Sequence, residues 1–241
     1  MVPTSDEQWH FIAHLLSFAS PEDALTAYYA PYHQRTQLFT HGQGVADGFL
    51  AICQIGYDLF TPLVVMRAVS DDVSSTLLSD HLDERREYLF AVKEQTVPVL
   101  KRCLITWDEH YNLIYTVDEA SFWPNSRHPV EKVIKADGFP CFEIRDDKGV
   151  IAAAGTNWRS PHFAEVGVWT QESRRGRGLA KAVVSACTAE LLRGGIRPLY
   201  IVAEGNTASI RVCEALGYRF SGYREFSCRG RLSGIHLLDF A

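Results

Sequence analysis

The residues with the clearest chemical potential form the basic, glycine-rich stretch from Arg174 to Lys181. It reads Arg-Arg-Gly-Arg-Gly-Leu-Ala-Lys and lies between an apolar, strand-like run at 164–169 and a helical pattern from Leu179 to Leu192. Glycines let a turn bring its N–H groups together, and the helix that follows adds the positive end of its dipole. Arginines at three of its first four positions supply counter-charge. We therefore expect an anion site here, and the ligand that we infer is a pyrophosphate.

Two common phosphate motifs do not fit this stretch. A P-loop needs four residues between two glycines and then Lys-Ser or Lys-Thr, and no segment of the chain has this pattern. A dinucleotide fingerprint needs Gly or Ala three residues after its second glycine, where this chain has Lys181. The loop is therefore neither a P-loop nor a dinucleotide-binding turn.

The pattern that fits is Arg-x-x-Gly-x-Ala, formed by Arg175, Gly178 and Ala180. It resembles the acyl-CoA loop of the GCN5-related N-acetyltransferase (GNAT) superfamily, Gln/Arg-x-x-Gly-x-Gly/Ala. A basic surface turn before a helix could look the same. However, residues 206–218 are similar to the family's other signature, in which an Asn opens a helix, Ala-Ser follows, and Leu-Gly-Phe/Tyr closes it. Two motifs in the right order favour the acyl-CoA interpretation, and the resemblance covers residues 139–228.

The resemblance implies a set of contacts to coenzyme A. The backbone of 168–170 is expected to pair with the pantetheine arm and the thioester carbonyl, and the loop amides of 176–181 are expected to take the pyrophosphate. Asn206, a good helix N-cap, and Ser209 are expected to be polar contacts to the CoA arm. The predicted CoA-binding residues are Val168, Trp169, Thr170, Arg175, Gly176, Arg177, Gly178, Leu179, Ala180, Lys181, Asn206 and Ser209.

Glu165 is the candidate general base. In the family a glutamate ten positions before the loop arginine can act directly or through water, and a carboxylate in an apolar strand should have a raised pKa. A strand-edge salt bridge or an anchor for the substrate amine would explain Glu165 equally, and Glu204 is a weaker rival. Gly167 suggests a β-bulge that frees backbone N–H groups, or simply room for a bulky neighbour.

The chain departs from the family at Cys213, where many members have a tyrosine that protonates the CoA thiolate. A thiol could donate a proton, but a cysteine on the apolar face of a helix is more often part of the core. Solvent or Tyr218 could serve instead. The sequence therefore leaves the acid step unassigned.

Composition describes an ordinary globular chain of 241 residues, 46% hydrophobic and 22% charged. The start has neither a basic nor an apolar signal region, apolar runs are strand-sized, and the six cysteines are scattered, which together favour a cytoplasmic protein without a metal site. Residues 1–120 carry a net charge of −10 and residues 121–241 carry +5, which is consistent with a phosphate-bearing ligand on the second half.

The predicted organisation is two α/β halves. Residues 121–241 should form a GNAT acetyltransferase domain, with a mixed, mostly antiparallel sheet flanked by helices. Residues 1–120 also alternate strands with helices and read either as a degenerate GNAT-like domain without a glycine loop or as an unrelated α/β cap. Helices are predicted at 5–19 and 130–136. The proline-rich segment 122–129 is expected to link the halves or to line a cleft with its aromatic residues.

The predicted function is acetyl-CoA-dependent N-acetylation of an amine, by direct transfer in a ternary complex. A small-molecule amine is the expected acceptor, and neither nucleic acid nor membrane is an expected partner. A non-catalytic acyl-CoA sensor is the alternative, because the family's tyrosine is missing. A nucleic-acid binder using the Arg-Gly-Arg-Gly run is disfavoured by the acidic total and by the lack of interleaved aromatic residues.

Overall fold

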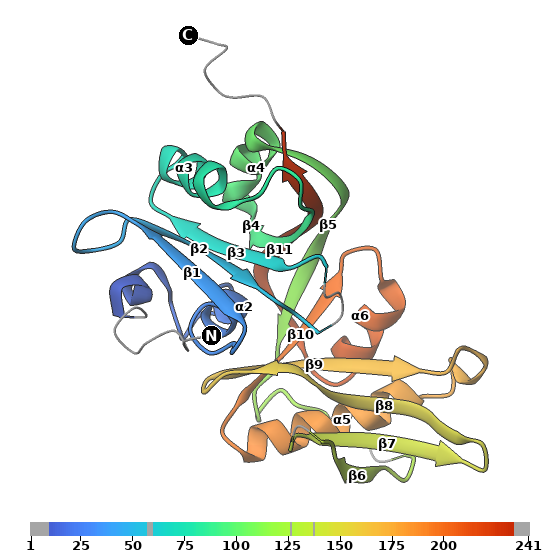
Figure 1. The fold of residues 1–241 in the computed structure, drawn as a ribbon. Coiled ribbons are helices and arrows are strands. Elements are labelled where there is room, and N and C mark those ends of the chain that lie inside the picture. The colour runs from blue at the N-terminus through green and yellow to red at the C-terminus, as the bar shows by residue number, and fades with distance from the viewer. Residues whose placement is uncertain (1–9, 57–59, 126, 137, 234–241) are drawn as a thin grey trace. The chain divides into compact units, whose positions relative to one another are not determined.

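A computed structural model describes residues 10–56, 60–125, 127–136 and 138–233. The described strands form a mixed, mostly antiparallel sheet in the order β1-β2-β3-β4-β11-β5-β10-β9-β8-β7-β6 (Figure 1). The chain divides into two compact units, residues 1–112 with 224–241 and residues 113–223. This division falls inside β5 (Leu104–Thr116) and β11 (Arg219–Leu232), so each of these strands contributes to both units.

Unit one begins with short helices, η1 (Ala13–Leu15) and α2 (Ala24–Tyr29). An antiparallel sheet of three strands follows, and α3 then leads to β4, which lies parallel to β3. A short 3-10 turn and α4 lead into β5. The bounds are β1 Thr36–His41, β2 Gly48–Cys53, β3 Leu63–Ala68, α3 Asp71–His81, β4 Tyr88–Lys93, η2 Glu94–Thr96 and α4 Val97–Cys103.

Both faces of the unit-one sheet are covered, because alternate residues of its strands point to opposite sides. Leu50, Val64 and Met66 pack with α3 and α4, whereas Phe49, Ala51 and Val65 pack with the N-terminal helices. Figure 1 shows these two helical layers on opposite faces of β1 to β3. The apolar strands predicted here are therefore buried on both faces, as their near-continuous hydrophobic runs require.

Unit two repeats this order of elements. Three antiparallel strands, β7 to β9, are followed by α5, by the parallel strand β10, and by α6. Figure 1 shows α5 packed along β7, β8 and β9. The bounds are β6 Glu131–Ile134, β7 Pro140–Asp146, β8 Gly149–Arg159, β9 Phe163–Thr170, η3 Glu172–Arg174, α5 Leu179–Arg193, β10 Arg197–Ala203 and α6 Thr207–Glu214.

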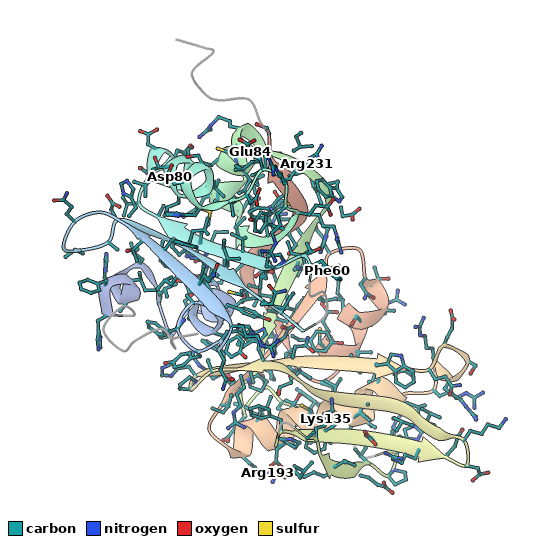
Figure 2. The ribbon with its side chains drawn as sticks, in the orientation of Figure 1. Phe60, Asp80, Glu84, Lys135, Arg193 and Arg231 are labelled. Carbon is teal, nitrogen blue, oxygen red and sulfur yellow. The ribbon has the colours of Figure 1, made fainter. Side chains whose placement is uncertain are left out.

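Two predictions about helices are wrong. Residues 131–134 form the edge strand β6, antiparallel to β7, and the hairpin turn follows at Lys135, which Figure 2 labels. The Lys135 amide donates a hydrogen bond to the Phe139 carbonyl at 3.0 Å, and Lys132 on β6 forms a 2.7 Å ion pair with Glu190 on α5. Pairing with β7 across this short hairpin thus overrides the helical pattern of the segment.

The predicted N-terminal helix also ends earlier than expected. Its proposed capping box at Ser5 lies outside the described residues, and the described helical segment ends at Leu15. The glycine-rich loop that follows His41 is a hairpin connection between β1 and β2. Within the described residues, no helix has both the length and the apolar composition to span a membrane.

Candidate functional site

The loop between η3 and α5 presents a row of backbone donors. Gly176 and Gly178 both have a φ of 78°, a left-handed conformation that favours glycine. None of the amides of residues 176–181 donates to a described group, and the first amide of this region with an acceptor is Ala182, which donates to the Gly178 carbonyl at 3.2 Å. Six consecutive N–H groups at a helix N-terminus form a suitable environment for an anion.

The three arginines of this loop differ in what they contact. Arg174 is held in an ion pair by Asp146, at the turn between β7 and β8. Arg175 donates from Nε to the Thr170 carbonyl at 3.4 Å, while the guanidinium of Arg177 has no partner among the described residues. The predicted counter-charge of three arginines is therefore reduced, because Arg174 is already neutralised by a carboxylate.

A pocket of about 1010 Å³ opens over this loop and lies within unit two. All twelve residues predicted from the sequence to contact CoA line it. Among the described residues the lining contains no acidic side chain, and its basic residues are Arg127, Arg174, Arg175, Arg177, Lys181 and Arg211. A positive, concave site of this kind concentrates anionic ligands. The sequence-predicted residues are thus brought together, although their contacts to CoA stay a prediction.

One wall of the pocket is formed where two parallel strands separate. The pairing of β9 with β10 consists of Phe163 with Arg197, Ala164 with Pro198, and Glu165 with Leu199. Beyond Glu165 the two strands have no paired residues, and 168–170 of β9 line the pocket instead. Thr170 Oγ1 is buried there without a described hydrogen-bond partner. The unpaired edge of β9 could accept an extended ligand much as it would accept another strand.

The irregularity predicted at Gly167 lies on the neighbouring strand. Gly167 pairs regularly with Gly155, and the register shifts on β8 between Thr156 and Trp158, so that Asn157 is the extra residue. A Cβ at Gly167 would lie 2.3 Å from Asn157 Oδ1. Gly167 therefore makes room for a neighbouring side chain, which is the second of the two interpretations that its sequence allowed.

The same asparagine contacts the candidate base. Asn157 Nδ2 donates to Glu165 Oε1 at 2.9 Å, and Glu165 is partly buried at the last paired position of β9. Glu165 is not among the residues that line the pocket over the glycine loop. It lies at the closed end of the separation between β9 and β10, on a strand whose later residues 168–170 do line the pocket.

The N-terminus of α6 forms the opposite wall. Asn206 caps the helix as predicted, because its Oδ1 accepts from the Ser209 amide at 3.1 Å. The Ser209 hydroxyl is 2.8 Å from the hydroxyl of Tyr200 on β10. These two predicted CoA contacts are therefore already ordered by local hydrogen bonds.

Neither side chain considered for the acid step lines this pocket. Cys213 has 0% exposure, contacts the Ile210 carbonyl through its sulfur at 3.1 Å, and has a pKa that burial raises to about 12. Tyr218 is also buried, with its hydroxyl 2.7 Å from Thr188 Oγ1, and burial raises its pKa strongly. Both belong to the core between the sheet and the helices.

Sequence reasoning missed several lining residues. Tyr200 lies in a strand and reads as core, and Arg211 reads as a solvated helix position. Asn125, Arg127 and His128 come from the segment expected to link the halves or to bring aromatic residues to a cleft; its polar side chains line the pocket instead. No local pattern marks these residues, because their proximity to the loop results from tertiary packing.

A family model matches most of the sequence of unit two. Residues 135–225 match the model of a family described as GNAT acetyltransferase. This segment is similar to the GNAT acetyltransferase family. No curated protein matches the sequence. The GNAT match includes the glycine loop, the separated strands and α6, so it covers most of the residues that form the pocket.

Solved structures resemble the whole chain. A tandem GNAT protein from the clavulanic acid biosynthesis pathway aligns with a TM-score of 0.61 and 12% identity, covering 98% of both chains. A GNAT-family acetyltransferase structure from Novosphingobium aromaticivorans has a TM-score of 0.58 and 20% identity, covering 80% of this chain and 91% of that one. A Drosophila protein has a TM-score of 0.68 and 13% identity, covering 93% and 94%. The expected tandem arrangement of the fold is confirmed.

Proposed function

We propose that this protein is an acetyl-CoA-dependent N-acyltransferase that acetylates the amine of a small molecule by direct transfer. The observation that carries the proposal is the row of six amides at 176–181 that have no acceptor among the described residues, at the base of a basic pocket in the segment that matches the GNAT family. The pyrophosphate of CoA is a dianionic group that matches these donors in charge and hydrogen-bonding capacity. The basic side chains around the pocket add electrostatic attraction.

In this proposal the pantetheine arm extends from the loop along the free edge of β9. Its amide groups pair with the backbone of 168–170, and Thr170 Oγ1 offers a further polar contact. The thioester then lies toward the closed end of the strand separation, where β9 last pairs with β10. Backbone pairing fixes the arm at a defined depth, because a strand edge provides donors and acceptors at regular intervals.

Glu165 acts as the general base at this end, directly or through a water molecule. It accepts the proton that the incoming amine loses as its nitrogen bonds to the acyl carbon. The Asn157 amide holds the carboxylate in position through its 2.9 Å hydrogen bond. Direct transfer in a ternary complex needs no covalent acyl-enzyme, and the buried thiol of Cys213 is unsuited to forming one.

The first test is Gly178→Glu. A side chain at a φ of 78° is strained, and a carboxylate at the end of the anion loop repels the pyrophosphate. We expect CoA binding, measured by calorimetry, to be lost while the circular dichroism spectrum is retained. Gly195→Glu is the matched control, because Gly195 has a φ of 70°, has open space around its Cβ position and does not line the pocket.

Turnover is measured separately, with acetyl-CoA, a panel of small-molecule amines and detection of the free thiol. Thiol release that depends on an amine supports an acyltransferase. Tight CoA binding without turnover across the panel would favour the sensor, whose support is the burial of Cys213 at the position where the family often has tyrosine. Unchanged CoA affinity in Gly178→Glu would contradict both functions.

A further inference from the structure

Tyr200 lines the pocket, although its place in an apolar strand does not indicate this in the sequence. It follows Leu199, the last residue of β10 that pairs with β9, and it lines the pocket with only 2% of its surface exposed. Its ring packs edge-on against Tyr218 at 5.8 Å, which fixes its orientation. Its hydroxyl is 2.8 Å from Ser209 Oγ on α6.

The Tyr200 hydroxyl is close to the helix that carries Cys213. Cys213 lies on α6 where a tyrosine would be expected, and its sulfur points into the core. Burial raises the pKa of the Tyr200 phenol to about 12, and Cys213 adds to this rise. A tyrosine hydroxyl from β10 therefore contacts α6 at Ser209, four residues before the α6 position that lacks a tyrosine.

The geometry also relates Tyr200 to the reactive end of the ligand. The β9 edge from Glu165 to Thr170 covers five residue steps, or about 17 Å of extended chain. With the pyrophosphate at the loop and the pantetheine arm along this edge, the sulfur lies at the end where β9 and β10 meet. Tyr200 is the first β10 residue beyond the last pair.

We propose that the Tyr200 hydroxyl is the hydrogen-bond donor that stabilises the CoA thiolate as it leaves. This inference rests on the proposed acyltransferase function and assigns a catalytic residue to its last step. Ser209 orients the phenol: its hydroxyl donates to the Tyr200 oxygen and leaves the Tyr200 O–H directed at the sulfur. Either hydroxyl of this pair can act as the donor in the free protein.

The electrons and protons balance in this step. The amine nitrogen bonds to the acyl carbon, the carbonyl reforms, and the C–S bond breaks with its electron pair passing to sulfur. The amine proton goes to the base, and the thiolate accepts the Tyr200 hydrogen bond until solvent protonates it. The phenol remains neutral throughout, because burial raises its pKa to about 12 and keeps the hydroxyl protonated across the working pH range.

The test uses Tyr200→Phe, with Tyr218→Phe as its control. Each variant removes one phenolic oxygen, and the two rings are neighbours. However, the Tyr218 hydroxyl is hydrogen-bonded to Thr188, and Tyr218 does not line the pocket. The first measurement is the pKa of the CoA thiol in the protein–CoA complex, followed by thiolate absorbance in the ultraviolet. A donor to the thiolate lowers this pKa, so we expect it to rise by about one to two units in Tyr200→Phe only.

The second measurement is turnover. Since the hydrogen bond forms as negative charge develops, Tyr200→Phe should lower kcat roughly 10- to 100-fold with little change in KM for acetyl-CoA. Ser209→Ala should give a smaller loss, because it removes the orienting group and keeps the donor. An unchanged thiol pKa in Tyr200→Phe, with CoA still bound, would overturn the inference and leave the proposed function standing. A wild-type protein that binds no CoA would instead refute the proposed function.

Discussion

Two glutamates, Glu165 and Glu225, differ in the groups that surround their carboxylates. Glu165 accepts a hydrogen bond from Asn157 at the closed end of the β9–β10 separation. Glu225 lies in the unit-one part of β11, near Arg67, Asn112 and Ser227. Glu165 is the general base in our proposal, whereas Glu225 has no role in catalysis. Substitutions that remove only the charge can therefore separate catalysis from stability.

Glu165→Gln removes the base and keeps the shape of the side chain. We expect kcat to fall roughly 100-fold or more, because general base catalysis typically contributes two to four orders of magnitude. The affinity for CoA should change little, since Glu165 does not line the pocket over the loop. Steady-state kinetics and calorimetry on the same preparation measure the two effects. A loss of CoA affinity as large as the loss of turnover would assign Glu165 a structural role.

Glu225→Gln tests a partly buried charge. Burial raises the pKa of this carboxyl from 4.5 to about 7, although Asn112, Arg67 and Ser227 oppose the rise. The folded state therefore binds the proton more tightly than the unfolded state, and stability falls as the pH rises from about 4.5 to about 7. We expect Glu225→Gln to be more stable than wild type at pH 8, by up to about 3 kcal/mol, and nearly equal to it at pH 4.

The measurement is the denaturant midpoint of both proteins at the two pH values. Glu84→Gln is a suitable control, because Glu84 lies exposed at a turn of unit one (Figure 2). If the advantage of Glu225→Gln were the same at both pH values, the carboxylate would not be the cause.

At the scale of elements, the segment before β6 supports the anion loop. His128 Nε2 lies 3.0 Å from the Arg177 carbonyl, which it holds on the side of the loop facing segment 122–129. Because the C=O and N–H of a trans peptide point in opposite directions, this contact turns the Gly178 N–H away from His128. The same imidazole is 3.7 Å from the position of a Cβ at Gly178. His128 is thus a positioning residue for the loop.

We expect His128→Ala to weaken CoA binding roughly 5- to 10-fold, the effect of losing one well-placed hydrogen bond. The loss should be specific to ligands with a pyrophosphate. Calorimetry with CoA and with pantetheine, which lacks that group, distinguishes this from general damage to the pocket. An equal loss for both ligands would contradict the role assigned to His128.

At the scale of the whole molecule, only the second of the two similar units has an anion loop within the residues that the structure describes. In unit one, α3 follows β3 after two residues, Val69 and Ser70, and the Ser70 hydroxyl already accepts from the Val73 amide at 3.3 Å. The first turn of α3 contains Asp71 and Asp72, which repel anions. Unit one therefore repeats the element order of unit two, but not the row of backbone N–H donors or the positive charge at the start of the helix.

We therefore expect one CoA per chain. Titration calorimetry should give a stoichiometry near one, and Gly178→Glu should eliminate all of the binding. Two equivalents of CoA, or a residual site in Gly178→Glu, would show that unit one also binds the nucleotide.

Local features were predictable from the sequence because neighbouring residues determine them. The glycine loop, the Asn206 cap and most strands of both units depend on backbone conformation and on alternation along a few residues. The left-handed conformation at Gly217 is of this kind, with a φ of 91°. The repeated order of strands and helices, and the lack of a glycine loop in the first half, follow from the same patterns.

Contacts between distant segments were decided only by the tertiary structure. A Cβ at Gly217 would lie 1.8 Å from the Ser121 carbonyl, a constraint that no pattern around Gly217 contains. Even over a short separation in sequence, residues 131–134 form a strand because the adjacent strand β7 provides a partner. Packing likewise turns Cys213 into the core, while it brings Tyr200 and His128 to the pocket. Sequence thus determined the anion loop, and long-range packing determined which side chains surround it.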